Sequence, residues 1–237
     1  MDALPPNLET LLNPAVAEVR STVPRMREQM IWEAACSLGA RGGLANRTLE
    51  IRKALDARAP QLDRFSFQPF MTSEGMLPPV IAEERDPVRQ EGDKDKRSAS
   101  FIYRMVREAR LVTIAPTWRD YLFAGLAQDI SVEMPHKSFN PANAAEKEIW
   151  RRAVTECWSA GVAQADGVFN ENMSRFERDY YGTIRYKMLA GRGMVEGLRV
   201  GTEFRPVSGN DTEIIIDDQR YRITGAGGLI PDSRRWK

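Results

Sequence analysis

Apolar side chains recur at helical spacing after Pro24, and this pattern predicts a helical region in the first quarter of the chain. Residues 26–38 and 44–55 both follow the 3.6-residue period, and Pro24 suits the first turn of a helix. Gly42 and Gly43 lie between the two runs, and each glycine costs a helix about 1 kcal/mol relative to alanine. The region is therefore either two helices or one helix whose glycines let another element approach closely.

The helical period is strongest from residue 140 to residue 189. Asn140 can cap a helix and Pro141 suits the first helical position. One unbroken helix of this span would be about 70 Å long, whereas a compact domain of this size has a radius of gyration of ~18 Å. We therefore expect either a break, near Asp166 and Gly167, or an elongated molecule.

Other parts of the chain change to the two-residue period of β-strands. Phe101, Tyr103 and Met105 alternate with polar positions, and β-forming residues follow, so a hairpin is predicted within residues 99–114. A short strand is predicted at residues 80–82. Near the C-terminus, three short strands are predicted at residues 202–207, 213–217 and 220–224. Turn signals at 209–210 and 217–218 separate them.

Two segments lack a regular period. Residues 2–23 are interrupted by prolines and are predicted to form an extended N-terminal arm with one short helix at residues 8–12. Residues 83–98 are almost wholly polar and are predicted to form a flexible loop. The predicted fold is α+β and predominantly helical, with a long helix in the C-terminal half, a central β-hairpin and a small C-terminal antiparallel β unit. We expect a single domain over residues 24–237.

Composition narrows the class of protein without identifying it. The chain has 237 residues, of which 42% are hydrophobic and 28% charged, and its net charge is +1. This balance predicts no broad basic surface for nucleic acid. No window approaches 18 apolar residues, and residues 1–10 do not resemble a targeting segment. The expectation is either a cytosolic protein or a mature fragment whose signal has been removed.

The residues that usually carry chemistry are sparse. The single histidine, His136, lies in a polar segment and is predicted to be solvated instead of binding a metal. Cys36 and Cys157 lie on apolar helical faces, and we expect two buried thiols of low reactivity. The glycine-rich segments 39–43 and 225–228 match no phosphate-binding motif, so close packing is their expected use. No catalytic set, metal or cofactor is predicted, and we expect that the protein is not an enzyme.

The segment Pro116-Thr117-Trp118-Arg119-Asp120-Tyr121 is the densest cluster of residue types that dominate binding interfaces. A partner-contact surface is one interpretation. The other is a core tryptophan beside a helix N-terminus, with Arg119 and Asp120 paired locally. The sequence favours neither.

Four blocks of sequence carry a family resemblance. They are SLGARGGLA at residues 37–45, APTWRDYL at residues 115–122, EIW at 148–150 followed by Trp158, Gly161 and Gln164-Ala165, and PDS at 231–233 followed by Trp236. In this order the chain resembles the DotC family of type IVB secretion systems, called TraI in related conjugation systems. The resemblance extends from about residue 34 to the C-terminus.

The resemblance implies a structural role. Members of the family are outer-membrane lipoproteins that face the periplasm and join a DotD-like lipoprotein and a DotH-like protein in a ring-shaped core complex. They help to place the DotH-like protein at the outer membrane and have no associated enzymatic activity. The resemblance also implies an N-terminal lipid on a cysteine, removed with its signal peptide ahead of Asp2, and no direct contact with nucleic acid. A relaxase or helicase is excluded, since this chain lacks the histidine cluster and the P-loop of those enzymes.

Two of the blocks supply the candidate contact residues. We expect Arg41, Gly42 and Gly43 of the first block to pack with Trp118, Arg119, Asp120 and Tyr121 of the second, or each block to pack against a neighbouring subunit. The Trp118→Ala substitution is then expected to abolish assembly or folding. Two other classes remain as alternatives: a cytosolic helical adaptor that binds through an aromatic and arginine surface, and a cell-wall hydrolase of the same compartment.

Overall fold

The structure, a computed structural model, describes residues 7–12, 23–90, 94–126 and 131–237. The chain divides into two compact units, and the single domain expected over residues 24–237 stays a prediction. Unit 1 comprises residues 1–62 and 122–173, and unit 2 comprises residues 63–121 and 174–237. Helix α5, Ala144–Gly191, supplies residues to both units.

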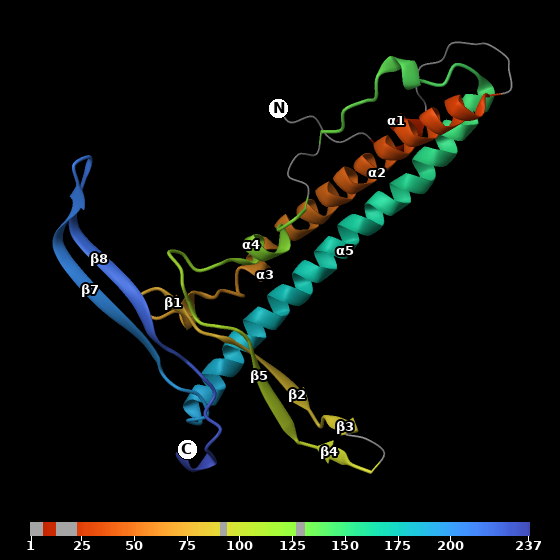
Figure 1. Cartoon of the computed structure of the whole chain (residues 1–237). Helices are drawn as coiled ribbons and strands as arrows, with labels where there is room; N and C mark the ends of the chain where they lie inside the picture. The colour runs from red at the N-terminus through yellow and green to blue at the C-terminus, as the bar shows by residue number, and fades with distance from the viewer. Residues whose placement is uncertain (1–6, 13–22, 91–93, 127–130) are drawn as a thin grey trace. The chain divides into compact units, whose positions relative to one another are not determined.

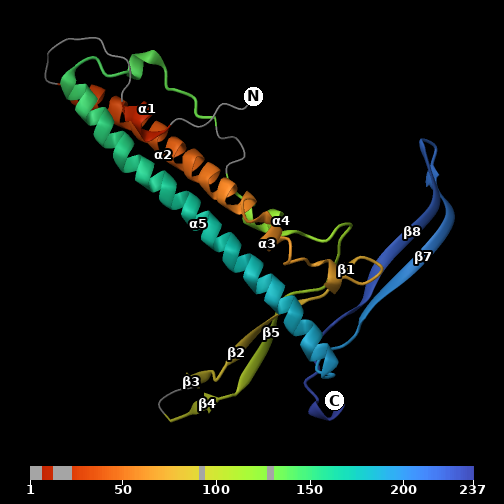
Figure 2. The same cartoon turned by 180° about the vertical axis from the view of Figure 1, so that it is seen from behind.

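Unit 1 is built on two long helices that run side by side (Figures 1 and 2). Helix α2, Arg25–Asp56, is one continuous helix of 32 residues, so Gly42 and Gly43 do not interrupt it. Helix α5 is also continuous over 48 residues, so the break near Asp166 and Gly167, one of the two expected alternatives, does not occur. Asp166 instead accepts a 2.7 Å hydrogen bond from Arg47 of α2, which holds the two helices together at that level.

Helix α5 begins later than the sequence predicts. Asn143 accepts a 2.9 Å hydrogen bond from the N–H of Glu146, and the Glu146 carboxylate accepts one of 2.8 Å from the N–H of Ala142. These bonds satisfy N–H groups that lack a partner inside the helix. Asn140 instead ends a short 3-10 helix, η2 at Lys137–Phe139, so the prediction of an Asn140 cap and a helical Pro141 is wrong.

The short helix predicted in the N-terminal arm is confirmed as α1, Leu8–Leu12. It is packed into unit 1 and is not a free arm. Leu11 is completely buried, and its carbonyl oxygen accepts a 2.8 Å hydrogen bond from the indole of Trp150. The core around it consists of Leu11, Ile31, Ala35, Leu38, Trp150, Ala153 and Val154. The rest of the arm, residues 1–6 and 13–22, lies outside the described residues.

Unit 2 contains a long irregular hairpin in its first half. Going outward, β1 (Met76–Leu77) pairs with β6 (Arg110–Leu111), β2 (Val80–Arg85) with β5 (Phe101–Arg107), and β3 (Val88–Gln90) with β4 (Lys96–Ser98), all antiparallel. Residues 101–107 therefore pair with an earlier strand instead of with residues 111–114. The sequence predicts a loop in the polar segment 83–98, but the structure places the end of β2, all of β3 and β4 in it. Strands β3 and β4 are exposed, so they show no apolar alternation.

The C-terminal part of unit 2 is one long hairpin, where the sequence predicts three short strands. Strand β7, Leu198–Asn210, pairs with β8, Glu213–Ala226, and the side chain of Asn210 accepts hydrogen bonds from the N–H groups of Thr212 and Glu213 in the turn. The predicted turn at 217–218 lies inside β8, although Asp217 has a left-handed φ of 58°. Aspartate tolerates this conformation as a single residue, and the ladder continues past it.

Short elements complete the fold: α3 at Ala59–Leu62, η1 at Gln68–Phe70, α4 at Trp118–Leu122 and η3 at Ser233–Arg235. The predicted α+β class, with its long C-terminal-half helix and antiparallel hairpins, is confirmed. Among the residues that the structure describes, no helix has the length and apolar character needed to cross a membrane.

Candidate functional site

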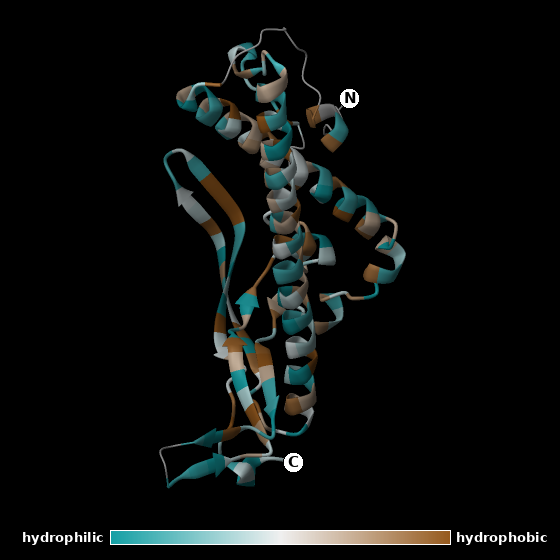
Figure 3. Ribbon diagram, turned by 90° about the vertical axis from the view of Figure 1, so that its right-hand side faces the viewer, coloured by the Kyte–Doolittle hydropathy of each residue, from teal (hydrophilic) through white to brown (hydrophobic). Residues whose placement is uncertain are grey.

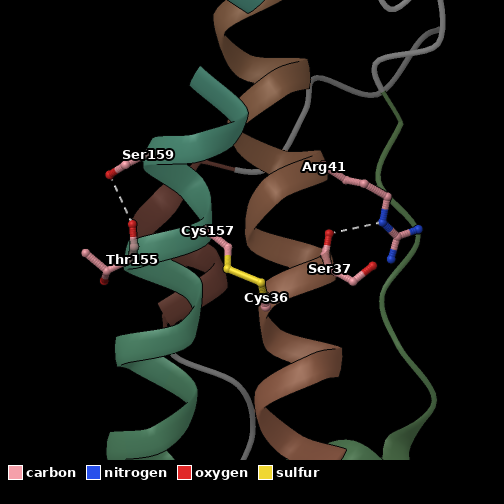
Figure 4. The surroundings of a disulfide bond; sticks show 6 residues. All are labelled: Cys36, Ser37, Arg41, Thr155, Cys157 and Ser159. Atoms are coloured by element: carbon pink, nitrogen blue, oxygen red, sulfur yellow. Dashed lines mark hydrogen bonds between the residues drawn. A yellow bond between two sulfur atoms is a disulfide. The ribbon is translucent and has the colours of Figure 1, made fainter. Parts of the chain in front are cut away.

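The two cysteines form a disulfide that joins α2 to α5 (Figure 4). Cys36 and Cys157 are 121 positions apart in sequence, and their Cα atoms lie 5.0 Å apart. The prediction of two separate buried thiols is therefore wrong. Both cysteines lie on apolar helical faces, but only knowledge that the two helices are neighbours would have paired them.

Glycines bring the same two helices into backbone contact around the disulfide. A Cβ atom on Gly39 would lie 2.6 Å from the carbonyl oxygen of Val154. A Cβ on Gly43 would collide with the carbonyl oxygen of Trp158, and one on Gly161 with that of Ala40. Only glycine permits so close an approach, so the close packing expected of residues 39–43 is confirmed.

The sequence candidates in this block have different surroundings. Gly42 and Gly43 are buried, whereas Arg41 is exposed and donates a 3.3 Å hydrogen bond to the carbonyl oxygen of Ser37 (Figure 4). A Cβ on Gly42 would meet Leu11 of α1 at 2.6 Å. The two glycines thus serve packing inside unit 1, and only Arg41 faces solvent.

Ion pairs support the helix pair at both sides of the disulfide. Arg47 of α2 pairs with Asp166 of α5 at 2.7 Å, and Arg27 pairs with Glu146 at 3.2 Å. Burial alone would raise the pKa of Glu146, but hydrogen bonds from Arg27 and from the backbone of Ala142 outweigh it and lower the pKa. Unit 1 is therefore built on two helices that are joined by a disulfide and by ion pairs, and it has no free thiol among its described residues.

The APTWRDYL block reaches into unit 2, where Trp118 belongs to the core. Its side chain is 1% exposed, and its indole N–H donates a 2.7 Å hydrogen bond to Asp63. Asp120 accepts hydrogen bonds of 2.7 and 2.8 Å from the N–H and hydroxyl of Thr117, which holds the start of α4. Arg119 stacks 4.1 Å from the Trp118 ring centroid and pairs with Asp63 at 3.6 Å. Trp118 thus fits the core interpretation, and Arg119 forms an ion pair with Asp63.

Tyr121 leads to a buried carboxylate that the sequence analysis missed. Its hydroxyl donates a 3.0 Å hydrogen bond to Asp179 of α5, whose side chain is 1% exposed. Arg107 and Arg178 both form ion pairs with Asp179. The available signal was an aspartate among the aromatic residues of the helical pattern. Phe67 and Phe176 pack against the Tyr121 ring, and Tyr180 packs against Phe67.

Because Tyr121 is buried, we expect the stability of unit 2 to fall at alkaline pH. Burial, with the neighbouring charge of Asp179, raises the pKa of Tyr121 to about 12 from 10.0. Because the raised pKa belongs to the folded state, this contribution to stability is complete below pH 10 and is lost as the pH rises to about 12. We expect the wild-type free energy of unfolding to fall more steeply than that of Tyr121→Phe between these pH values in urea titrations. Parallel curves would contradict the assignment.

The two candidate blocks belong to different units and have different neighbours. Gly42 and Gly43 pack with α1 and α5, whereas Trp118 and Tyr121 bond to Asp63 and Asp179 of unit 2. Packing of one block against the other, or against a neighbouring subunit, stays a prediction. His136 caps η2 through a 3.3 Å hydrogen bond from the N–H of Ser138. In the described parts of the chain, no three acidic, histidine or cysteine side chains are grouped to hold a metal ion.

These features define a structural class: a helix pair joined by a disulfide and combined with long antiparallel hairpins. A family model described as type IV secretory system, conjugal DNA-protein transfer (TraI) matches residues 25–237, so the chain belongs to this family. The match includes both long helices and every strand named above. No curated protein is similar enough to this chain to count as a match.

Proposed function

We propose that this protein is a structural subunit of the outer-membrane core complex of a type IVB secretion or conjugation system, equivalent to DotC. In this role it faces the periplasm, assembles with DotD-like and DotH-like proteins and helps to place the DotH-like protein at the outer membrane. Membership of the conjugal-transfer family supports this role. The blocks SLGARGGLA and APTWRDYL, which resemble the DotC family, support a DotC-like member within it.

The disulfide between Cys36 and Cys157 is the observation that carries the proposal. Structural disulfides form and persist in oxidising compartments such as the periplasm and are rare in the cytosol, where thiols are kept reduced. The bond joins two neighbouring helices at close range and is supported by the glycine contacts around it. A cytosolic adaptor, the main alternative, would gain no such bond, so the disulfide counts against it.

A mechanical role suits the arrangement inside unit 1. The helix pair is braced by the disulfide, by glycine contacts and by the Arg27–Glu146 and Arg47–Asp166 pairs. A helix pair held together at so many points resists deformation by neighbouring subunits, as a ring subunit requires. Helix α1 packs against this helix pair. We propose that an N-terminal lipid beyond this segment anchors the protein to the outer membrane, and that the protein has no enzymatic activity.

Affinity purification from the native host tests the proposal. The tagged full-length gene product is purified from detergent-solubilised envelopes, and the co-purifying proteins are identified by mass spectrometry. We expect recovery in the outer-membrane fraction together with a DotH-like and a DotD-like protein. Recovery from the soluble cytoplasm without either protein, and with Cys36 and Cys157 reduced, would overturn the proposal and favour the adaptor.

A further inference from the structure

The β7–β8 hairpin is a long two-stranded ribbon whose apolar side chains are exposed on both faces. Residues directly opposite one another in an antiparallel pair share a face. Val207 and Ile216 lie opposite each other on one face, and Phe204 and Tyr221 lie on the other. Figure 3 shows the hydrophobic segments along this ribbon. The exposed large apolar residues of the ribbon are Phe204, Val207, Ile214, Ile215, Ile216 and Tyr221.

A ribbon of this kind is incomplete by itself. In the described part of the chain, no third strand pairs with β7 or β8. An isolated two-stranded hairpin is only marginally stable in water, and its edges offer a row of unpaired N–H and C=O groups to another strand. Exposed apolar residues on both faces indicate a surface that another protein covers.

We propose that β8 of one copy of this chain pairs antiparallel with β7 of the next copy, so that a continuous sheet runs from subunit to subunit. The inference rests on the proposed function, since it supplies the contact between copies in the ring. Copies related by rotation about one axis hold their hairpins in the same orientation. The next strand beyond β8 is then β7 of the neighbour, and it is antiparallel to β8.

Charge complementarity supports a second copy as the occupant. Within one ribbon, Glu203 lies opposite Arg220, and Arg205 lies opposite Asp218. We call the register level when each residue of β8 faces the same position in the neighbour's β7 as it faces in its own β7. In the level register, the same charged pairs form again between β8 and the neighbour's β7. Each row then alternates in sign around the ring: acid, base, acid, base at one level and the reverse at the next. Opposite charges at facing positions stabilise a sheet, whereas like charges destabilise it.

A groove beside β8 provides room for the incoming strand. It has a volume of about 630 Å³ and lies between Gln219, Arg220 and Tyr221 of β8 and residues 73–75 and 111–113 of the same unit. In the level register, residues 202–204 of the neighbour lie opposite residues 219–221. Phe204 is 54% exposed in the single chain, and Leu111 is an exposed apolar residue in the groove. The neighbour's Phe204 ring therefore covers apolar surface that water otherwise contacts.

Pro206 interrupts the β7 edge at a point where β8 is also irregular. Pro206 has no N–H to donate to a neighbouring strand, and prolines in sheets are found at edges for this reason. In the level register, Pro206 of the neighbour lies opposite Asp217, whose φ of 58° already departs from strand geometry. The two interruptions thus coincide at the same position along the strands. The charged rows described above lie before that position in β7 and remain free to pair between copies.

Charge reversal of one pair gives a test that separates contacts between copies from contacts within one. We measure self-association of the full 237-residue chain by analytical ultracentrifugation, with Glu203→Arg, Arg220→Glu, the double variant and a mixture of the two single variants. Each single variant places like charges opposite each other everywhere, so we expect its association to weaken about tenfold or more. The double variant should associate like the wild type. The mixture should associate as well, because only pairing between different copies can place a Glu203→Arg strand opposite an Arg220→Glu strand.

Two further results decide the inference if a reversed hairpin misfolds. Phe204→Ala should weaken self-association without lowering the melting temperature, because this ring is exposed in the single chain. Met26→Ala, which removes an exposed apolar side chain from α2, is the matched control and should change neither quantity. The inference is overturned if the wild type stays monomeric at its highest soluble concentration, if the mixture fails to associate while Phe204→Ala associates normally, or if Phe204→Ala only lowers stability.

The outcomes also separate this inference from the proposed function. Recovery of the protein with DotH-like and DotD-like partners, together with no effect of Glu203→Arg or Phe204→Ala on association, removes only the β7–β8 contact. Mixture rescue in a protein that is recovered alone from the cytoplasm removes the core-complex role but keeps the contact between copies.

Discussion

Replacement of both Cys36 and Cys157 by alanine is expected to lower the free energy of unfolding of unit 1 by about 5 kcal/mol. The disulfide closes a loop with a sequence separation of 121, and the chain-entropy account of cross-links gives roughly this value for a loop of that length. The measurement is a urea titration followed by tryptophan fluorescence, to which Trp150 and Trp158 at or next to the α2–α5 contact contribute.

Two controls connect the effect to the bond itself. The single variants Cys36→Ala and Cys157→Ala each remove the whole disulfide, so their effects should resemble that of the double variant instead of adding to it. Reduced wild-type protein should also unfold at the lower urea concentration. A wild type whose transition is unchanged by reductant, with two free thiols found on titration, would show that the bond does not form.

Sequence pattern predicts most elements of this fold but few of their contacts. The 3.6-residue period marks both long helices, because each buries one face. The strands around residues 83–98 escape prediction because β3 and β4 are polar and exposed, so they carry no apolar signal. The partner of residues 101–107 is missed because strand pairing depends on distant residues.

The same limit applies to the candidate site. The glycines at 39–43 signal a close approach, but the sequence does not say what approaches, and the structure identifies α5. The disulfide requires knowledge of that same pairing of helices. The start of α5 is different, because Asn143 and Glu146 form a capping pair that is readable in the sequence, and Asn140 with Pro141 is a competing signal of equal quality.

Two glycines on α5 should respond to the same substitution with opposite signs. Gly161→Ala is expected to lower the free energy of unfolding by about 3 kcal/mol, because the new methyl group collides with the backbone of Ala40 and forces the helices apart. Gly167→Ala is the matched control. It has no atom within 4 Å of the new Cβ, so it should raise stability by about 1 kcal/mol through helix propensity alone. Urea titration of the two variants beside the wild type measures both effects.

The Gly161 effect should also depend on the disulfide. Cys157 is one helical turn from Gly161, and its bond to Cys36 fixes the separation of α2 and α5 at that level. When the bond is present, the helices cannot move apart to accommodate a methyl group, so the full cost of the collision remains. In the Cys36→Ala/Cys157→Ala background the helices can separate, and we expect Gly161→Ala to cost less than half as much. An equal loss of stability in both backgrounds would mean that the glycine contacts alone set the distance between α2 and α5. The disulfide would then only link two helices that already lie at that distance.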